Sequence, residues 1–293
     1  MKTKLFEEIE RSSIFRTTEL SNREYHSRRC PGISSSALES IKISARHHDQ
    51  YERDKLHNEI SKPQCFAFGS ALHDAILTPD DYESLYVLEP EGTERRSNAG
   101  KAAWKEFLEA NEGKTILKRN SGEYDDFKKI QIMRDRFFSH PTVSALVQGA
   151  TFEESFFALC NRTGILKKCR PDILRNDGII LDIKTTKSAY LDYFSSDILK
   201  LNYHVKAAWY MDIVEQVTGV KQTHFILIAM ETTAPFGIAL YNIPNIMIAL
   251  GRENYTEWID KFAKERELDY KYCYPEVIQE ANVPHWIEKK VGL

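Results

Sequence analysis

Three ionisable side chains near the middle of the chain have types and a spacing that suit hydrolysis of a phosphodiester. Asp172 ends an Arg-Pro-Asp triplet, and nine residues later an Asp-Ile-Lys triplet runs from Asp182 to Lys184. Side chains alternate between the two faces of a strand, so Asp182 and Lys184 should project from the same face. A hairpin turned at the Asn-Asp-Gly sequence of residues 176–178 would place Asp172 beside Asp182. The spacing therefore predicts that two carboxylates and one ammonium meet at one place.

The chemistry of such a group is that of a magnesium site. Mg²⁺ prefers hard oxygen ligands and retains several waters, so one or two carboxylates suffice to hold it. The ion activates water and neutralises charge that builds on the phosphate. A neighbouring lysine can orient or deprotonate the attacking water and stabilise the transition state. We therefore expect Mg²⁺ as the cofactor, with Mn²⁺ able to substitute, and Asp172, Asp182 and Lys184 as catalytic residues.

An Asp-x-Lys triplet also arises often by chance, and it then forms only a weak ion pair on an exposed strand. The neighbouring residues argue against that interpretation, because Ile179, Ile180, Leu181 and Ile183 make this strand apolar on both faces. A buried carboxylate without a partner is costly. The two charged residues inside such a strand therefore favour a functional site.

Two further groups could join this site. Glu153 and Glu154 lie on the predicted strand before the turn at residues 161–164, where one of them could supply a third carboxylate or both could face solvent. His73 lies in an otherwise apolar helical segment, residues 65–78. A histidine in that setting is commonly a core residue with its hydrogen bonds satisfied, but it could also approach the metal as a ligand.

The composition is that of an ordinary globular protein, with 293 residues, 42% hydrophobic and 28% charged. The sequence has neither an apolar run of about 18 residues nor an apolar N-terminal segment of the signal-peptide kind, so we expect a cytoplasmic protein without membrane contact. Its five cysteines form no C-x-x-C pair, which argues against a zinc site or a disulfide framework. The net charge is −3, but Lys167, Lys168 and Arg170 adjoin the acidic motif and are candidate nucleic-acid contacts.

Periodicity and turn residues predict an α+β fold with a central mixed sheet, helices on its flanks and a helical N-terminal portion. We expect a single domain over residues 1–293, with a mainly helical part (1–150), a catalytic sheet core (151–243) and a C-terminal helix and irregular tail (244–293). Helices are predicted at 34–57, 65–78, 101–112, 123–148 with an interruption near Pro141, 191–218 and 244–268, with a loop at 87–100. Strands are predicted at 152–160, 165–174 and 178–184, as an antiparallel meander, and at 223–231 and 236–243.

Several segments resemble one branch of a known nuclease superfamily. Residues 66–77, FAFGSALHDAIL, resemble the G-x-x-x-H helix of the RecB- and RecE-like nucleases. Residues 153–172 resemble the E-x-S…TG…K-x-RPD stretch of the RecE-like (exonuclease VIII) branch of the PD-(D/E)XK superfamily, and IILDIKTTKSA matches its D-x-K-T-T strand. Weaker matches occur at 33–36 and 226–241, so that the resemblance extends from about Tyr25 to Trp258. Each motif is weak alone, but all five occur in the same order.

This resemblance implies an α/β/α restriction-endonuclease-like core and a role for each matching residue. Lys184 would be the catalytic lysine. Glu153 fits the E-x-S spacing better than Glu154 does. The metal site would be lined by His73, Glu153, Asp172, Asp182 and the backbone carbonyl of Ile183.

The chain departs from the family at one position of the expected DNA contacts. The Q-x-x-x-Y motif of the family keeps Tyr210 here but has Lys206 where glutamine is expected. A lysine could still contact a DNA phosphate as a point charge, although it cannot accept a hydrogen bond. We therefore expect DNA-binding roles for Lys206, Tyr210, Arg170 and Lys168.

The resemblance also implies an exonuclease that digests one strand of double-stranded DNA from a 5′ end. It would leave 3′ tails for a RecT-like single-strand annealing protein, would be encoded by a phage or prophage, and would form a homo-oligomer. Alternatives are an endonuclease or flap nuclease of the same fold and a non-catalytic protein that binds DNA ends. An iron–sulfur nuclease is disfavoured, because the chain lacks a clustered C-terminal cysteine triplet.

Overall fold

The computed structural model describes residues 4–57, 64–92, 95–119, 123–268, 273–274, 276–281 and 283. Its N-terminal part is mainly helical, as the sequence predicts, and contains α1 (Lys4–Arg11), α2 (Asn22–His26), a 3-10 turn (Ser35–Ala37), α3 (Leu38–Ile43), α4 (Ala45–His57), α5 (Gln64–Leu77), α6 (Pro79–Leu85), α7 (Asn98–Ala110), α8 (Asp126–Ser139) and α9 (Pro141–Val147). Three short strands also occur here, β1 (Ile14–Thr17), β2 (Tyr86–Leu88) and β3 (Thr115–Leu117). The part that follows contains β4 (Thr151–Phe152), β5 (Ser155–Leu159), β6 (Leu166–Cys169), β7 (Ile173–Leu174), β8 (Ile179–Thr186), α10 (Leu191–Lys200), α11 (Tyr203–Thr218), β9 (His224–Glu231), β10 (Ile238–Asn242) and α12 (Asn245–Glu267).

The central sheet is mixed and has the strand order β10-β9-β8-β7-β4. Strand β8 lies in the middle and pairs parallel with β9, from Ile179 opposite His224 to Thr186 opposite Glu231. The remaining pairs of this sheet are antiparallel. The parallel pair is connected through α10 and α11, which gives the chain the crossover that adjacent parallel strands require. This arrangement confirms the predicted α+β fold with a mixed sheet and flanking helices.

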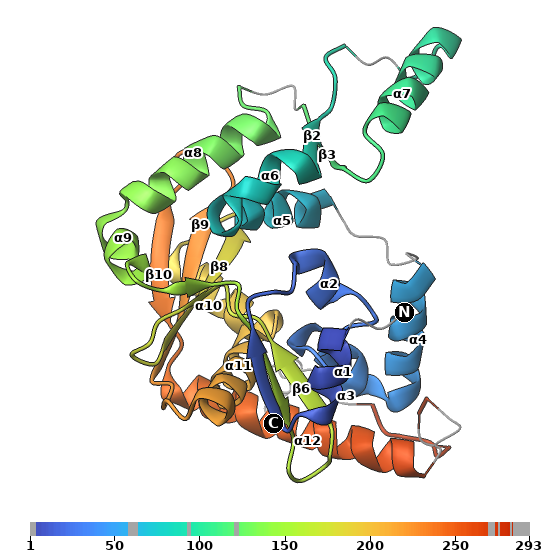
Figure 1. Cartoon of the computed structure of the whole chain (residues 1–293), viewed down its shortest axis with the longest axis vertical. Helices are drawn as coiled ribbons and strands as arrows, with labels where there is room; N and C mark the ends of the chain where they lie inside the picture. Colours follow the sequence, from blue (N-terminus) through green and yellow to red (C-terminus); the bar gives the residue numbers. More distant parts are fainter. Residues whose placement is uncertain are drawn as a thin grey trace.

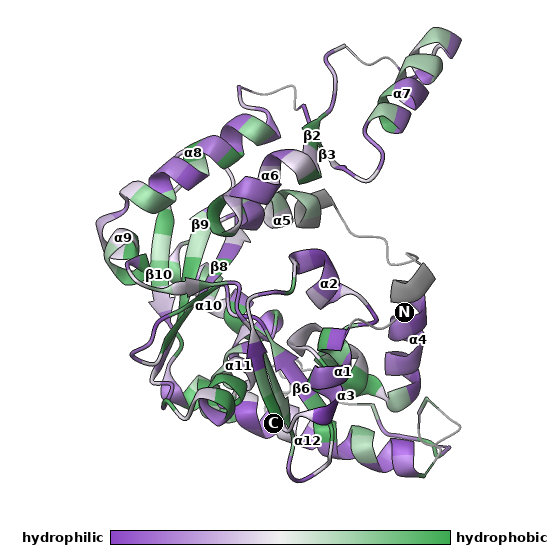
Figure 2. Cartoon of the chain, in the orientation of Figure 1, coloured by the Kyte–Doolittle hydropathy of each residue, from purple (hydrophilic) through white to green (hydrophobic). Residues whose placement is uncertain are grey.

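Helices cover both faces of the central sheet (Figure 1). Ile180 of β8 belongs to the apolar cluster formed with α10, α11 and α12, whereas Leu181 and Ile183 belong to the cluster formed with α5, α8 and α9. Because strand side chains alternate in direction, Asp182 and Lys184 point to the same side as Ile180, toward α11. Figure 2 shows β9 and β10 as largely hydrophobic between these layers, while α8 carries long hydrophilic stretches.

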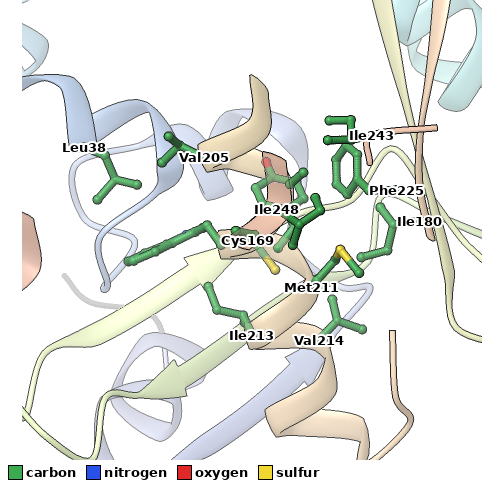
Figure 3. Packing of buried hydrophobic residues seen from close by; sticks show 14 of the residues in the cluster. Leu38, Cys169, Ile180, Val205, Met211, Ile213, Val214, Phe225, Ile243 and Ile248 are labelled. Carbon is green, nitrogen blue, oxygen red and sulfur yellow. The ribbon is translucent and has the colours of Figure 1, made fainter. Parts of the chain in front are cut away.

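Helix α11 forms the centre of the larger apolar cluster. Its Val205, Met211 and Val214 are buried and lie in the same cluster as Ile180 of β8 and Phe225 of β9 (Figure 3). Packing of a helix along its whole length against the sheet restricts the positions of all its side chains. Lys206 in the first turn of α11 is therefore held beside β8 by the burial of its neighbours.

The predicted three-stranded meander is wrong in one respect. Segments 152–160 and 165–174 form one antiparallel hairpin with constant register, but each strand is interrupted, so β5 and β6 join β1 in a second sheet and only β4 and β7 continue into the central sheet. The interruption lies at Glu153, whose φ is +53°, and on the other strand at Pro171, which has no N–H to donate. These two residues redirect the hairpin at the point where Asp172 enters the central sheet.

Most helix predictions are confirmed, and the differences have local causes. The predicted helix at 34–57 is divided at Ser44, whose backbone is extended. The predicted helix at 65–78 ends before Pro79, which then occupies the first turn of α6. Strand β2 overlaps the start of the region predicted as a loop at 87–100. The elements α1, β1 and α2 were not predicted because they are short and depend on distant partners. Much of the predicted irregular tail lies outside the described residues.

Replacing Gly178 with alanine should destabilise the protein more than replacing Gly164. Both glycines have positive φ, +84° and +68°, but an added Cβ at Gly178 would lie 2.3 Å from the carbonyl oxygen of Lys221, whereas nothing lies within 4 Å of one at Gly164. We expect a loss of about 1 kcal/mol for Gly164→Ala from the backbone conformation alone. Gly178→Ala adds a backbone clash and should cost about 2 to 5 kcal/mol. Urea unfolding measures both losses, and equal values would contradict the clash.

Candidate active site

The hairpin between β7 and β8 brings Asp172 beside Asp182. Ile173 lies opposite Leu181, so the next pair in the same register is Asp172 and Asp182. Asp172 Oδ2 accepts a hydrogen bond of 2.7 Å from the backbone N–H of Ile183. Both aspartates are buried, with 5% and 0% of their surface exposed. The sequence interval between the two motifs thus becomes a short distance in space, and the backbone of β8 fixes the orientation of the Asp172 carboxylate.

Two lysines contact the carboxylate of Asp182. The ammonium of Lys184 donates to Oδ2 of Asp182 and lies 3.3 Å from the carbonyl oxygen of Ile183. Lys206 Nζ, from α11, lies 2.6 Å from Oδ1 of the same carboxylate. The site therefore contains the predicted two carboxylates and one ammonium, together with a second ammonium that sequence reasoning placed at the DNA instead.

The charges of this group are mutually dependent. Burial raises the pKa of Asp182, but the two nearby ammoniums outweigh burial and lower that pKa below its usual range. Burial lowers the pKa of Lys184, and Asp182 partly offsets this effect. Burial also lowers the pKa of Lys206, but the attraction of Asp182 outweighs burial and raises that pKa well above its usual value. Asp182 and Lys206 are thus an ion pair in which the carboxylate is completely buried and the lysine is partly exposed.

Glu153 is the glutamate that lies next to Asp172. Its backbone N–H donates to the carbonyl oxygen of Asp172 at 3.2 Å, and its carboxylate lies 2.5 Å from Nε of Arg170. Burial, followed by the charge of Asp172, raises the pKa of Glu153 to about 7 against the opposing effect of Arg170. Glu154 instead pairs with Arg16, at 3.7 Å. The structure thus separates the two glutamates, although the role of Glu153 stays a prediction.

Helix α5 brings His73 to the other side of Asp172. His73 Nδ1 lies 3.5 Å from Asp172 Oδ2, and its side chain is 26% exposed. Gly69 lies one turn earlier, where an added Cβ would be 3.4 Å from Oγ1 of Thr185, so this small residue allows α5 to approach β8. Sequence analysis missed the adjacent Asp74, which is buried and accepts a hydrogen bond of 2.6 Å from the hydroxyl of Tyr86.

The structure places three of the four expected DNA contacts in the interior. Lys168 is 3% exposed, and its ammonium donates to the carbonyl oxygens of Tyr25 and Cys30, at 3.2 and 2.9 Å. Arg170 and Tyr210 are 7% and 6% exposed. Their burial disfavours contact with DNA, and the DNA-binding roles of these three residues stay a prediction. Lys168 and Arg170 instead hold the N-terminal segment against β6.

Replacing Arg170 with glutamine should destabilise the fold. Its guanidinium pairs with Glu153 and donates from Nη1 to the carbonyl oxygen of Leu20 at 2.9 Å, and its side chain is 6% exposed. Removing one partner of a buried pair leaves the other uncompensated, so we expect a loss of about 3 to 5 kcal/mol in urea unfolding. Arg16→Gln is the matched control, because its pair with Glu154 is 60% exposed on the arginine side and should contribute less than about 1 kcal/mol. An Arg170→Gln protein as stable as the Arg16→Gln control would contradict this role.

The acidic residues fit a magnesium site that water and phosphate complete better than a site in which protein groups supply all the ligands. No cluster of three or more His, Cys, Asp or Glu side chains arranged to hold a metal occurs among the residues that the structure describes. However, the buried Oδ1 of Asp182 faces the ammonium of Lys206 at 2.6 Å, and a divalent cation could take the place of that ammonium. Magnesium is commonly held by one or two carboxylates while water and phosphate complete its coordination. Asp172, Asp182 and the carbonyl of Ile183 fit that donor set.

Among the described residues, no helix is both long enough and apolar enough to span a bilayer.

Comparisons with known proteins identify a similar fold and a matching family. A crystal structure of a candidate exonuclease from Eubacterium rectale has a similar fold, with a TM-score of 0.57 and 15% identical residues over 94% of this chain and 98% of that one. An alkaline exonuclease from Laribacter hongkongensis matches with a TM-score of only 0.27 and 12% identity, over 69% of this chain and 95% of that one. No protein with a curated description matches the chain. Residues 34–275, most of the chain, match the family described as a PDDEXK-like domain of unknown function (DUF3799), and the chain belongs to this family.

Proposed function

We propose that this chain is a metal-dependent deoxyribonuclease that digests linear double-stranded DNA from an end. The observation that carries the proposal is the convergence of Asp172, Asp182 and Lys184 where β7 meets β8. The family membership supports the same chemistry, because its description names the PD-(D/E)XK motif. A non-catalytic DNA-binding protein would have no need to bury this set of charges, which is costly without a function.

The proposed reaction assigns one task to each residue of the site. When bound, a divalent ion would supply Lewis acidity and activate water. Asp172 and Asp182 would hold the ion, and the N–H of Ile183 keeps Asp172 in one orientation. Lys184 would orient or deprotonate the attacking water, and its charge would stabilise the phosphate as negative charge develops. The ring of Tyr203, 5.1 Å from Lys184 Nζ, limits where that ammonium can move.

The finer features of the proposal come from the RecE-like resemblance. We propose 5′ to 3′ digestion that produces 3′ single-stranded tails, which a RecT-like annealing protein would then use. A homo-oligomeric assembly, a cytoplasmic location and a phage or prophage origin belong to the same proposal. The name of the structurally similar protein from Eubacterium rectale supports exonuclease activity over endonuclease activity, since that protein is named for an exonuclease.

End-labelled DNA tests this function directly. Linear duplexes labelled at either the 5′ or the 3′ end, and covalently closed circles of the same sequence, are incubated with the full chain with and without Mg²⁺. We expect immediate release of 5′ label, late release of 3′ label and intact circles, all only with Mg²⁺. Cutting of the circles would instead indicate an endonuclease, and early release of 3′ label would reverse the proposed polarity. No digestion of any substrate with Mg²⁺ or Mn²⁺ would contradict the nuclease itself.

A further inference from the structure

Lys206 occupies a position in the site that the resemblance does not explain. It lies in the first turn of α11, and its ammonium is 2.6 Å from Oδ1 of Asp182 and 4.8 Å from the centre of the Tyr210 ring. Its side chain is 24% exposed, whereas that of Asp182 is completely buried. Lys206 therefore reaches the innermost carboxylate from a partly open side, which leaves its ammonium a route back toward solvent.

The two oxygens of Asp182 are consequently both in contact with a lysine. Lys184 contacts Oδ2, and Lys206 contacts Oδ1, the buried oxygen that could otherwise bind a divalent cation. Contacts between an ammonium and a carboxylate are among the strong polar interactions of proteins. The glutamine expected at this position carries no charge, so it could not neutralise Asp182. The substitution of lysine for glutamine thus places a permanent competitor next to a metal ligand.

We propose that Lys206 is a built-in cation that competes with the divalent metal for Oδ1 of Asp182. The inference rests on the metal-dependent function proposed above. Binding of a metal at Oδ1 requires the ammonium to withdraw, so the parent protein binds metal more weakly than its carboxylates alone would allow. The same competition disfavours a second ion at this carboxylate, because one of its two oxygens is already paired with Lys184.

Mn²⁺ binding to the full chain tests the competition without any DNA. Calorimetric titration and the electron paramagnetic resonance signal of free Mn²⁺ are compared for the parent, Lys206→Gln, Lys206→Met and Lys206→Arg. Lys128→Gln is the control, since this exposed lysine lies in α8, away from β8. We expect the dissociation constant to fall about tenfold or more in the Gln and Met variants, as follows from removal of a charge-assisted contact that the metal must break. The Arg variant and the control should bind as the parent does.

Three outcomes would overturn the inference. The first is unchanged Mn²⁺ affinity in both neutral variants, and the second is an equal gain in Lys206→Arg, which would assign the effect to shape instead of charge. The third is weaker binding in the neutral variants, which would make Lys206 a support of the metal site. Thermal unfolding without metal checks that each variant is folded, and two neutral variants are used so that one folded variant suffices.

Digestion of linear DNA by the same preparations separates this inference from the proposed function. Tighter Mn²⁺ binding in the neutral variants with no digestion by any preparation would support the competition and contradict the nuclease. Digestion by the parent with unchanged Mn²⁺ binding in the neutral variants would support the nuclease and contradict the competition.

Discussion

Replacing Asp182 with asparagine is expected to abolish DNA digestion and to destabilise the protein. Its carboxylate is the only one in contact with both Lys184 and Lys206 among the described residues, and it is completely buried. The neutral amide would leave two ammoniums close together without a counter-charge, which should cost about 3 to 5 kcal/mol in urea unfolding without metal. Digestion should fall by at least about a thousandfold, because metal binding and transition-state charge stabilisation are both weakened.

The double variant Asp182→Asn with Lys206→Met separates the two effects of this substitution. Removing one of the two unpaired ammoniums should recover part of the lost stability, since the remaining lysine can shift toward solvent. Digestion should not recover, because the metal ligand is still absent. An Asp182→Asn protein as stable as the parent would show that the ion pairs of Asp182 contribute little to stability. An Asp182→Asn protein as active as the parent would contradict a catalytic role for Asp182.

Replacing Lys184 with alanine should have the second largest effect, and it should act on the reaction more than on metal binding. The loss of a positioned proton-transfer group and of its positive charge corresponds to a decrease of about 10² to 10⁴ in single-turnover rate. Asp172 and Asp182 remain, so Mn²⁺ should bind at least as tightly as in the parent. Quenched-flow digestion of a linear duplex at saturating Mg²⁺ measures the rate, with Lys128→Ala as the control. A rate within about threefold of the parent would contradict the catalytic role of Lys184.

The central geometry of the site was predictable because it depends on local rules. Alternation along one strand places Asp182 and Lys184 on the same face, and a turn at residues 176–178 determines which residue lies opposite Asp182. Both rules use short sequence intervals and backbone geometry only. The location of Asp172 beside Asp182 follows from them without knowledge of the rest of the fold.

The features that sequence analysis missed all depend on distant contacts. The sequence predicts that Lys168 and Arg170 are basic surface residues, but residues near the N-terminus cover them. Trp209 of α11 also donates to the carbonyl oxygen of Lys168 at 3.0 Å. Lys206 was assigned to DNA because it stands where the Q-x-x-x-Y motif of the similar nucleases has glutamine, and its sequence position shows no relation to Asp182. Its contact with that residue arises only when α11 packs on the sheet. The division of the long hairpin likewise depends on β1, which is too short to be recognised alone.

Basic residues that make interior contacts therefore have two different roles in this chain. Arg170 and Lys168 satisfy backbone carbonyls and Glu153, and their replacement should appear mainly in stability. Lys184 and Lys206 meet the carboxylate of Asp182, and their replacement should appear mainly in reaction rate and metal affinity. Comparing unfolding, Mn²⁺ binding and digestion across these variants would distinguish the two groups.

Digestion of a linear duplex by the parent and by Asp182→Asn, each with Mg²⁺ and with a chelator, tests the central claim most directly. The account predicts that the parent degrades the duplex only when Mg²⁺ is present and that folded Asp182→Asn protein does not degrade it under either condition. Equal digestion by the two proteins, or digestion by the parent in excess chelator, would contradict a metal-dependent site built on this carboxylate.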